Sequence, residues 1–473
     1  MDAETMTRES LQAFADRRRE GFEWELRNLV EMPTISSDPG CRDHMWRCAE
    51  YARDMFFRYG FEGEILETGG HPIVFGAMGR DPHLPTVTVY NHLDVQPANE
   101  PGWHTDPFRM VIDGDVFRGR GTTDDKGPAI TAFYGAIAAK EAGLPINIRF
   151  LWEMEEEVGS PSFRNAMERH RGKLATDLVV VSDTIWVTRG KPSTPAGLRG
   201  LMTFAMTLET AEHDMHSGLV GGAARNPLSE LMKVVAEMMD GETGKVKIPG
   251  FYDDVVKPEP EELEHWLNAG FDVDVFKRDH GIKSLRTEDP LKLMKRIWGR
   301  PTMDVHGVVG GYTGVGIKTA VPPRAEVKMS CRLVPGMDAH RTFERIRAFV
   351  AKHFPDVVVR EDHSLAPFRG HVSGPYAEAV QDAYHFAFGH PCVFTREGGS
   401  IGAVTTMENV LGAPVYFLGL SLPSHGYHAP NENYDWEQAS GGIALFARFF
   451  EHAARIGRVP EAAAPATENP TTV

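Results

Sequence analysis

Acidic residues and histidines follow predicted β-strands at several separate places in this sequence, and these are residue types that bind divalent metal ions. His92 follows the β-rich stretch 86–90, and the acidic run 153–157 follows the stretch 146–152, which alternates apolar and polar residues. Asp183 comes shortly after a third apolar run. In open α/β sheets, ligands and catalytic groups collect beyond the carboxyl ends of the strands. The sequence therefore predicts a metal site assembled from separate strands.

His92 and Asp94 form a His-x-Asp pair at the first strand end. Imidazole is a common zinc ligand, and a carboxylate two residues later can orient the ring. Such a pair also occurs often by chance, so its position at a strand end is what favours a metal.

The loop 119–127 is rich in glycine and contains Asp124 and Asp125. A phosphate cradle is the alternative, but the loop has neither the Walker A spacing nor a GxGxxG pattern, and adjacent aspartates would repel a phosphate. Acidic residues here fit a cation better, although Asp125 by itself is also typical of a solvated turn.

The run 153–157 has four acids in five positions, a pattern that most often marks a solvated face. Because this run follows an apolar strand and precedes Gly-Ser, we expect at least two of the glutamates to point into the crevice at the strand ends. Two neighbouring glutamates could divide the work, one binding a metal and the other taking a proton from water.

Histidines in the second half of the chain are further candidates. His216 lies in the polar segment 212–218, where a turn histidine bonded to the backbone is the alternative. His425 and His428 follow an apolar stretch, and spacing alone does not rank one above the other as a ligand.

The composition is that of a globular protein, with 42% hydrophobic and 25% charged residues among 473, a length that favours two domains. No apolar run could span a bilayer, and the polar N-terminal sequence lacks an export signal, so we expect a cytoplasmic protein. The net charge of −16, without a basic block, argues against nucleic acid or a membrane as partner. Four cysteines do not make a disulfide framework, and we expect buried or reduced thiols.

Strands and helices alternate in the first part of the chain, which predicts an α/β fold with a doubly wound catalytic domain. This domain is expected over 1–196 and 367–458, the latter including a strand at 414–420. We expect an inserted α+β lid and dimerisation domain over 197–366 and a disordered tail over 459–473. Within the insertion, one stretch, 241–300, is rich in proline and acidic residues and is expected to be irregular.

Ordered motifs along the whole chain resemble the M20 family of dinuclear metallopeptidases, and within it the carnosinase-like dipeptidases. The motifs are His92-Leu93-Asp94, Gly119-Arg120-Gly121, Asp124-Asp125-Lys126-Gly127-Pro128, Glu156-Glu157-Val158-Gly159-Ser160, Ser182-Asp183, His216-Ser217-Gly218, Thr319-Ala320-Val321-Pro322, Arg332-Leu333-Val334-Pro335, Arg396-Glu397-Gly398-Gly399-Ser400-Ile401 and His428-Ala429-Pro430-Asn431-Glu432. So many motifs in one order do not arise by chance.

The resemblance implies two divalent metal ions per subunit, zinc or alternatively manganese. His92 and Asp183 would bind one ion, Glu157 and His428 the other, and Asp124 would bridge them. It also implies a cis peptide bond after Asp124, and it ranks His428 above His425. Ions roughly 3.5–4 Å apart would activate a water held between them.

The remaining roles are also implied by the resemblance. Asp94 would orient His92, and Glu156 would be the general base. His216 would reach the active site of the partner subunit of a homodimer formed through the inserted domain and would polarise the scissile carbonyl. The substrate's carboxylate end would be bound by Arg332, Thr319 and Ser400.

The expected function is hydrolysis of amide bonds, as a dipeptidase or short-peptide carboxypeptidase. An N-acyl-amino-acid amidohydrolase with the same metal core is the nearest alternative, because the sequence does not show whether a free α-amino group is accepted. A non-catalytic binding protein on this fold is a further alternative. The presence of Asp124 and Glu156 argues against it.

Overall fold

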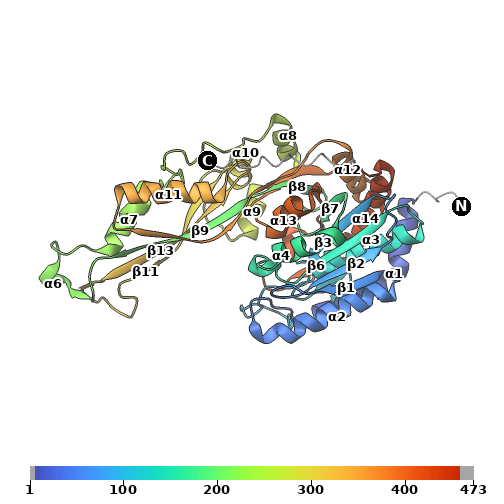
Figure 1. Ribbon diagram of the computed structural model, residues 1–473, viewed down its shortest axis with the longest axis horizontal. Helices are drawn as coiled ribbons and strands as arrows, with labels where there is room; N and C mark the ends of the chain where they lie inside the picture. Colours follow the sequence, from blue (N-terminus) through green and yellow to red (C-terminus); the bar gives the residue numbers. More distant parts are fainter. Residues whose placement is uncertain (1–5, 459–473) are drawn as a thin grey trace, which may run out of the picture. The chain divides into compact units, whose positions relative to one another are not determined.

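The computed structural model describes residues 6–458, and the chain forms two compact units (Figure 1). The first contains the chain up to Trp186, residues 373–392 and the chain from Thr406 onward. The second contains Val187–Val372 and Val393–Thr405, and so interrupts the first in sequence. The tail predicted to be disordered, 459–473, lies outside the described residues.

A six-stranded sheet in the order β1-β2-β6-β3-β7-β17 forms the centre of the first unit. Its strands are β1 Glu62–Leu66, β2 Ile73–Met78, β6 Asn147–Glu153, β3 Thr86–His92, β7 Leu178–Val181 and β17 Val415–Phe417. The last four of these run parallel to one another, whereas β2 is antiparallel to β6 and β1 to β2. Every residue of β3 is buried, as is typical of a central parallel strand.

Helices cover both faces of this sheet. The unit's main helices are α1 Arg8–Val30, α2 Arg42–Arg58, α3 Lys126–Glu141, α4 Phe163–Arg169, α12 Pro375–Phe388 and α14 Trp436–Ile456. Phe56 of α2 packs on Phe150 of β6, with ring centroids 5.5 Å apart. Tyr90 of β3 pairs in register with Leu151 and therefore points to the opposite face, where its ring meets Phe163 of α4. The doubly wound α/β prediction is confirmed.

The second unit is built on an antiparallel sheet in the order β11-β13-β9-β14. Its main elements are β9 Gly200–Glu209, α7 Pro227–Met238, β11 Thr302–Val309, β13 Arg324–Leu333, α11 Ala339–His353 and β14 Val358–Leu365. Alternate residues of β9 are buried, among them Phe204 and Met206, and they join Val234 of α7 and Ile346 of α11 in one hydrophobic core. One face of the sheet is thus covered by two helices.

The expectation that 241–300 is irregular was wrong. Three helices lie there: α8 Pro260–Asn268, α9 Val273–Asp279 and α10 Pro290–Trp298. Proline opens α8 and α10, where its missing N–H is harmless, and Asp289 caps α10 by accepting from the amide of Lys292 at 2.8 Å. Trp266 of α8 and Trp298 of α10 pack together, which gives this segment a small core.

The strand expected over 414–420 ends at Phe417, because the carbonyl of Gly419 accepts from the indole N–H of Trp186 at 2.7 Å and from the hydroxyl of Tyr384 at 2.8 Å. All four cysteines are buried, as expected. Over residues 6–458, no helix is both long and apolar enough to cross a membrane.

Candidate metal centre

Three adjacent strands of the first unit deliver candidate ligands to one edge of the sheet. β3 lies between β6 and β7 and is parallel to both. His92, the last residue of β3, is paired in register with Glu153, the last residue of β6, and Asp183 follows the end of β7 by two residues. The residues after these strands therefore lie at the same carboxyl edge, as the sequence predicts.

Asp124 lies between two histidines. Its Oδ1 is 3.0 Å from His92 Nε2, and its Oδ2 is 3.0 Å from His428 Nε2. Glu157 Oε2 lies 3.2 Å from the same nitrogen of His428, and Asp183 Oδ2 lies 3.8 Å from His92 Nε2. All five predicted metal ligands thus come together, and they divide into two groups that share Asp124.

Asp125 is a buried neighbour of this cluster, and the alternative of a solvated turn was wrong for it. Its Oδ2 accepts from the side-chain amide of Asn91 at 2.8 Å and from the backbone N–H of His92 at 3.3 Å. A carboxylate oxygen of Asp125 also lies within 4.8 Å of ligand atoms of His92 and Asp183. The peptide bond between Asp124 and Asp125 is cis, as expected.

The cluster is strongly charged. Burial opposes the ionisation of Asp124, but His428 and His92 outweigh it and hold the pKa of Asp124 below its ordinary value. Burial likewise opposes protonation of His92, yet Asp124 and Asp94 raise its pKa well above the ordinary value. Asp124 and Glu157 raise the pKa of His428 to about 11. Without a cation, the carboxylates therefore hold protons on both histidines.

Two divalent cations fit this donor set. Carboxylate oxygens and imidazole nitrogens are the ligands that catalytic zinc takes, and manganese accepts them as well. Oδ2 of Asp124 is buried and accepts no hydrogen bond among the described residues, although His428 lies at ion-pair distance. His428 itself has a φ of 52°, a left-handed backbone conformation that is uncommon outside glycine.

Asp94 links two parts of the centre. Its Oδ1 lies 3.4 Å from His92 Nδ1, and its two oxygens accept from the backbone N–H groups of Glu156 at 3.2 Å and Glu157 at 3.0 Å. His92 Nδ1 also lies 3.0 Å from the carbonyl oxygen of Asp94, so that this nitrogen is the donor and Nε2 is left to face Asp124. Asp94 positions both the histidine and the glutamate loop.

Glu156 begins a short 3-10 turn, Glu156–Val158, three residues after the end of β6. Burial raises its pKa well above the ordinary value. The carboxylate accepts no hydrogen bond from the chain between residues 6 and 458. A carboxylate with a raised pKa and no protein donor is suited to take up and release a proton.

Several residues of the centre were not predicted from the sequence. Glu432 accepts from the backbone N–H groups of Gly121, Thr123 and Asp124 at 3.0, 3.0 and 3.1 Å, and it pairs with Arg120 at 2.9 Å. This carboxylate fixes the loop that carries Asp124. The one sequence signal that pointed to Glu432 was its position at the end of the motif 428–432.

Two further side chains hold ligands in place. Tyr427 donates its hydroxyl to Asp183 Oδ1 at 3.2 Å. Gln96 donates to both oxygens of Glu157, through its backbone N–H at 3.1 Å and its side-chain amide at 2.7 Å. Neither residue carried a recognisable pattern of its own.

The choice between His425 and His428 is resolved by their neighbours. His425 is buried, and its Nε2 lies 3.0 Å from Asp435 Oδ2. Its Nδ1 accepts from the backbone N–H of Leu422 at 3.1 Å. Both ring nitrogens are therefore occupied away from the cluster, and His428 is the histidine that faces the carboxylates.

The other predicted residues, Arg332, Ser400, His216 and Thr319, lie in the second unit. Arg332 of β13 donates to Ser400 Oγ at 3.1 Å, and Ser400 donates to the carbonyl of Arg199. His216 is exposed, and Ser217 beside it donates to the carbonyl of Thr319 at 3.0 Å. His216 Nδ1 accepts from the N–H of Gly218 at 3.0 Å, so Nε2 is the ring nitrogen that could contact another group.

Comparisons with known proteins agree with this geometry. The profile of peptidase family M20/M25/M40 matches residues 88–452. The Cys-Gly metallodipeptidase dug1 of Schizosaccharomyces pombe is 31% identical over 95% of this chain and 99% of its own length. The Beta-Ala-His dipeptidase of Rattus norvegicus is 28% identical over 94% and 95%. Among solved structures, the M20 metallo-carboxypeptidase Sso-CP2 from Sulfolobus solfataricus has a TM-score of 0.84 at 27% identity, covering 92% and 99% of the two chains.

Proposed function

The chain belongs to the M20 family of metallopeptidases, and on that premise we propose how its own residues hydrolyse a peptide bond. The protein is a metal-dependent dipeptidase, as its relatives named Cys-Gly and Beta-Ala-His dipeptidases indicate. The observation that carries the proposal is the position of Asp124, whose two oxygens each lie 3.0 Å from a different histidine.

In this proposal two zinc ions are the native metals, with manganese as the alternative. His92 and Asp183 would hold one ion, Glu157 and His428 would hold the other, and Asp124 would be shared by both. The chemistry that such a metal pair would supply is Lewis-acid polarisation of the scissile carbonyl and a lower pKa of the attacking water. Asp94 orients the ring of His92. Tyr427 holds Asp183 in place, and Gln96 holds Glu157 in place.

Glu156 is the general base. It takes a proton from the attacking water and later passes that proton to the leaving amine. Its raised pKa supports this role, because a group that must both accept and return a proton works best when its pKa lies nearer the working pH than that of an exposed glutamate. The backbone of Glu156 is held by Asp94, and the carboxylate is therefore delivered on a fixed turn.

The second unit supplies the contacts to the substrate. One guanidinium nitrogen of Arg332 donates to Ser400, and its other N–H groups would bind the substrate's carboxylate. Thr319 and Ser400 complete that carboxylate site. His216 polarises the scissile carbonyl of the partner subunit's substrate, and its exposure on a short strand, β10 Met215–His216, is consistent with reaching outward.

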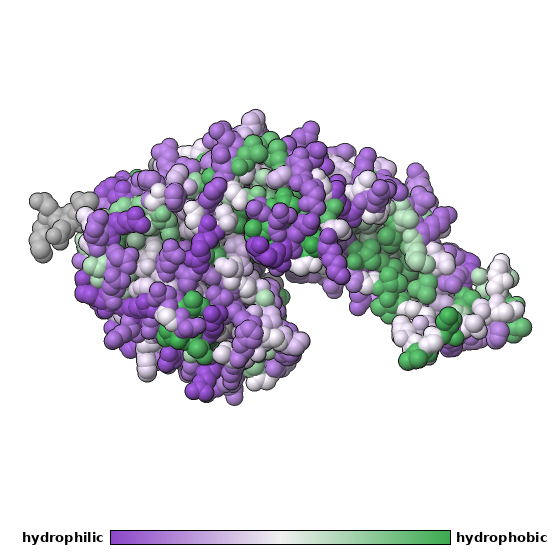
Figure 2. Space-filling view, turned by 180° about the vertical axis from the view of Figure 1, so that it is seen from behind, coloured by the Kyte–Doolittle hydropathy of each residue, from purple (hydrophilic) through white to green (hydrophobic). Residues whose placement is uncertain are grey.

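We propose a homodimer formed through the inserted domain, 197–366. β11 is an edge strand whose Val305, Val308 and Val309 are exposed, and Val315 and Ile317 of the following loop are more than nine-tenths exposed. Figure 2 shows hydrophobic side chains gathered on this part of the second unit. An exposed apolar patch on an unpaired edge strand is typical of a surface that another chain covers.

A substrate panel tests the proposed function. Metal-loaded protein should hydrolyse unblocked dipeptides, with Cys-Gly and β-Ala-His as the first probes, and should act weakly on matched N-acetyl amino acids. Glu156→Gln serves as the control for contaminating activity. Preference for the acylated set would instead make the protein an amidohydrolase with the same metal core, and hydrolysis that persists in the control would remove the proposal.

A further inference from the structure

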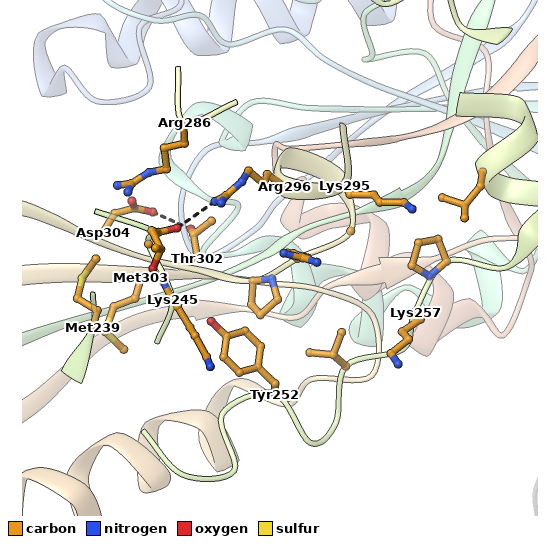
Figure 3. A pocket seen from close by; sticks show the side chains of 18 residues that line it. Met239, Lys245, Tyr252, Lys257, Arg286, Lys295, Arg296, Thr302, Met303 and Asp304 are labelled. Atoms are coloured by element: carbon orange, nitrogen blue, oxygen red, sulfur yellow. Dashed lines mark hydrogen bonds between the residues drawn. The ribbon is translucent and has the colours of Figure 1, made fainter. Parts of the chain in front are cut away.

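A pocket of about 780 Å³ lies within the second unit, in the segment expected from sequence to be irregular. It is bordered by the stretch that precedes α8, by α10 and by the first residues of β11, and Figure 3 shows the side chains that line it. None of its lining residues belongs to the metal centre or to the proposed substrate contacts. Its volume falls within the ordinary range for small-molecule sites.

The lining of this pocket is strongly basic. Six of its 18 residues are lysine or arginine and one, Asp304, is acidic. The six are Lys245, Lys257, Arg286, Lys295, Arg296 and Arg300. The whole protein carries a net charge of −16, so this concentration of positive charge is a local exception. Like charges gathered in one concavity repel one another and attract anions.

Two of the six cations are used to build the pocket. Arg286 donates to the carbonyls of Gly241 and Glu242, and Arg296 donates to the carbonyl of Thr243 at 3.1 Å. These bonds fix the turn that forms one rim. Asp304 is likewise engaged, accepting from the hydroxyl of Thr302 at 2.6 Å.

The other four cations have no acidic partner. Lys245, Lys257, Lys295 and Arg300 form no salt bridge with any residue from 6 to 458. They come from separate segments and line the same pocket, and Figure 3 shows Lys245 on one side of it and Lys257 and Lys295 on the other. Four uncompensated charges in a pocket are what a multivalent anion would neutralise.

The remaining wall is apolar and holds an aromatic ring. Met239, Val255, Leu263 and Met303 lie there, and the ring of Tyr252 is 37% exposed. The hydroxyl of Tyr252 accepts from the backbone N–H of Val246 at 2.8 Å, so the ring is held in place. A fixed, partly exposed ring beside apolar side chains offers a surface for a flat organic group.

We propose that this pocket binds an organic polyphosphate of nucleotide size. The phosphates would lie among the four cations that form no salt bridge with the described residues, and the flat base would lie against Tyr252. Lysine binds phosphate as a point charge and arginine as a fork, and both are supplied here. The pocket shares no residue with the metal centre, and its proposed ligand does not depend on the proposed peptidase function.

Calorimetric titration of the metal-loaded protein with ATP in excess magnesium tests the proposal, and adenosine and inorganic tripolyphosphate are the comparison ligands. The test variant is Lys245→Gln/Lys257→Gln/Lys295→Gln. The matched control replaces Lys233, Lys328 and Lys352 by glutamine, three exposed lysines of the same unit outside the pocket. Both variants lose the same formal charge.

ATP should bind the wild type and the control variant equally, and the test variant about tenfold or more weakly, because three charge-assisted contacts are lost. Adenosine should not bind, and tripolyphosphate should bind more weakly than ATP. Equal affinity of ATP for both variants would overturn the proposal. The same result is expected if ATP binds at the metal centre. So would the absence of ATP binding to the wild type, or equal binding of ATP and adenosine. Tripolyphosphate binding as tightly as ATP would overturn the role given to the apolar wall.

Discussion

The carboxylate of Asp94 accepts a hydrogen bond of 3.0 Å from the backbone amide of Glu157. A residue that follows β3 thereby fixes the loop that follows the neighbouring strand β6. The other oxygen of the same carboxylate binds the amide of Glu156 and lies 3.4 Å from the ring of His92. One buried side chain thus contacts His92, a proposed ligand, and the turn that carries Glu156, the proposed general base, and Glu157, a proposed ligand on the other side of the centre.

Asp94→Ala should weaken metal binding and stability together. The substitution leaves two backbone amides without their acceptor, which costs about 1–3 kcal/mol for each group that remains buried, and loss of a partner that orients a ligand typically lowers metal affinity by ~10–100-fold. Chelator competition and urea unfolding measure the two effects. Asp113→Ala, at a residue that is 76% exposed, is the matched control. Unchanged metal affinity in Asp94→Ala would show that the carboxylate does not position the ligands.

Asp124→Asn should reduce the metal content below two ions per subunit. The amide has one neutral oxygen in place of two anionic ones, so it cannot serve both metals as the carboxylate can. Elemental analysis of the purified variant after dialysis gives the stoichiometry. The conservative change preserves volume, and circular dichroism checks the fold. Full occupancy of both sites in this variant would contradict the bridging role.

Metal uptake should release protons. In the metal-free protein the pKa of His428 is raised to about 11 and that of His92 is also raised, so both rings are protonated at neutral pH, whereas a metal ligand must be neutral. Metal affinity should therefore increase as pH rises towards 11. Calorimetry in two buffers of different ionisation enthalpy counts the released protons. Identical heats in the two buffers would contradict this assignment.

The raised pKa of His428 also affects how the stability of the metal-free protein depends on pH. A histidine whose pKa is raised in the folded state stabilises the fold fully below its unfolded-state pKa of about 6.5. That stabilisation is lost as pH rises from there through about 11. The metal-free protein should therefore become less stable over this alkaline range relative to a His428→Ala variant. The metal-loaded protein should lack this trend.

His216→Ala and Glu156→Gln should complement each other in mixed dimers. Each variant alone should fold, dimerise and turn over poorly. If His216 acts on the partner's substrate, a mixed dimer contains one active site with both residues intact and should recover up to about half of the activity of one wild-type dimer. Subunit exchange followed by affinity purification of mixed dimers measures this. No recovery in such dimers, or a wild-type protein that is monomeric at assay concentration, would contradict the cross-subunit role.

The parts of the centre that could be predicted are those tied to a single strand and its end. His92 and Asp183 each follow an apolar run, and because parallel strands present ligands at their carboxyl ends, the sequence predicts that the two residues lie together. The bridging position of Asp124 was implied by family resemblance and not by spacing. The structure adds the distances that give each of its oxygens a different histidine.

What could not be predicted depends on pairings across the fold. Asp94 meets the Glu157 amide because β3 and β6 are in register at His92 and Glu153, a relationship that no local pattern records. The bonds that engage His425 come from Leu422 and Asp435, so its exclusion as a ligand required the folded loop. Glu432 reaches back more than 300 positions to the Asp124 loop.

The prediction that the segment 241–300 is irregular was wrong for a different reason. Its composition suggested an irregular chain, yet proline at the first helical position is a start signal for a helix, and it occurs at Pro260 and at Pro290, which follows the capping residue Asp289. The capping pattern was present and was outweighed by composition. The pocket that these helices help to form could not have been predicted, because its lysines are scattered along the sequence.

The most direct test of the proposed mechanism is a paired measurement on Glu156→Gln, of metal content by elemental analysis and of kcat on a dipeptide. Glutamine keeps the size of the side chain but cannot accept the proton, and general-base catalysis contributes about 10²–10⁴-fold. The account predicts two metal ions per subunit, as in the wild type, with kcat reduced by that factor. Two ions with near-wild-type kcat would contradict the role of Glu156, and a wild type that is fully active without metal would contradict the account as a whole.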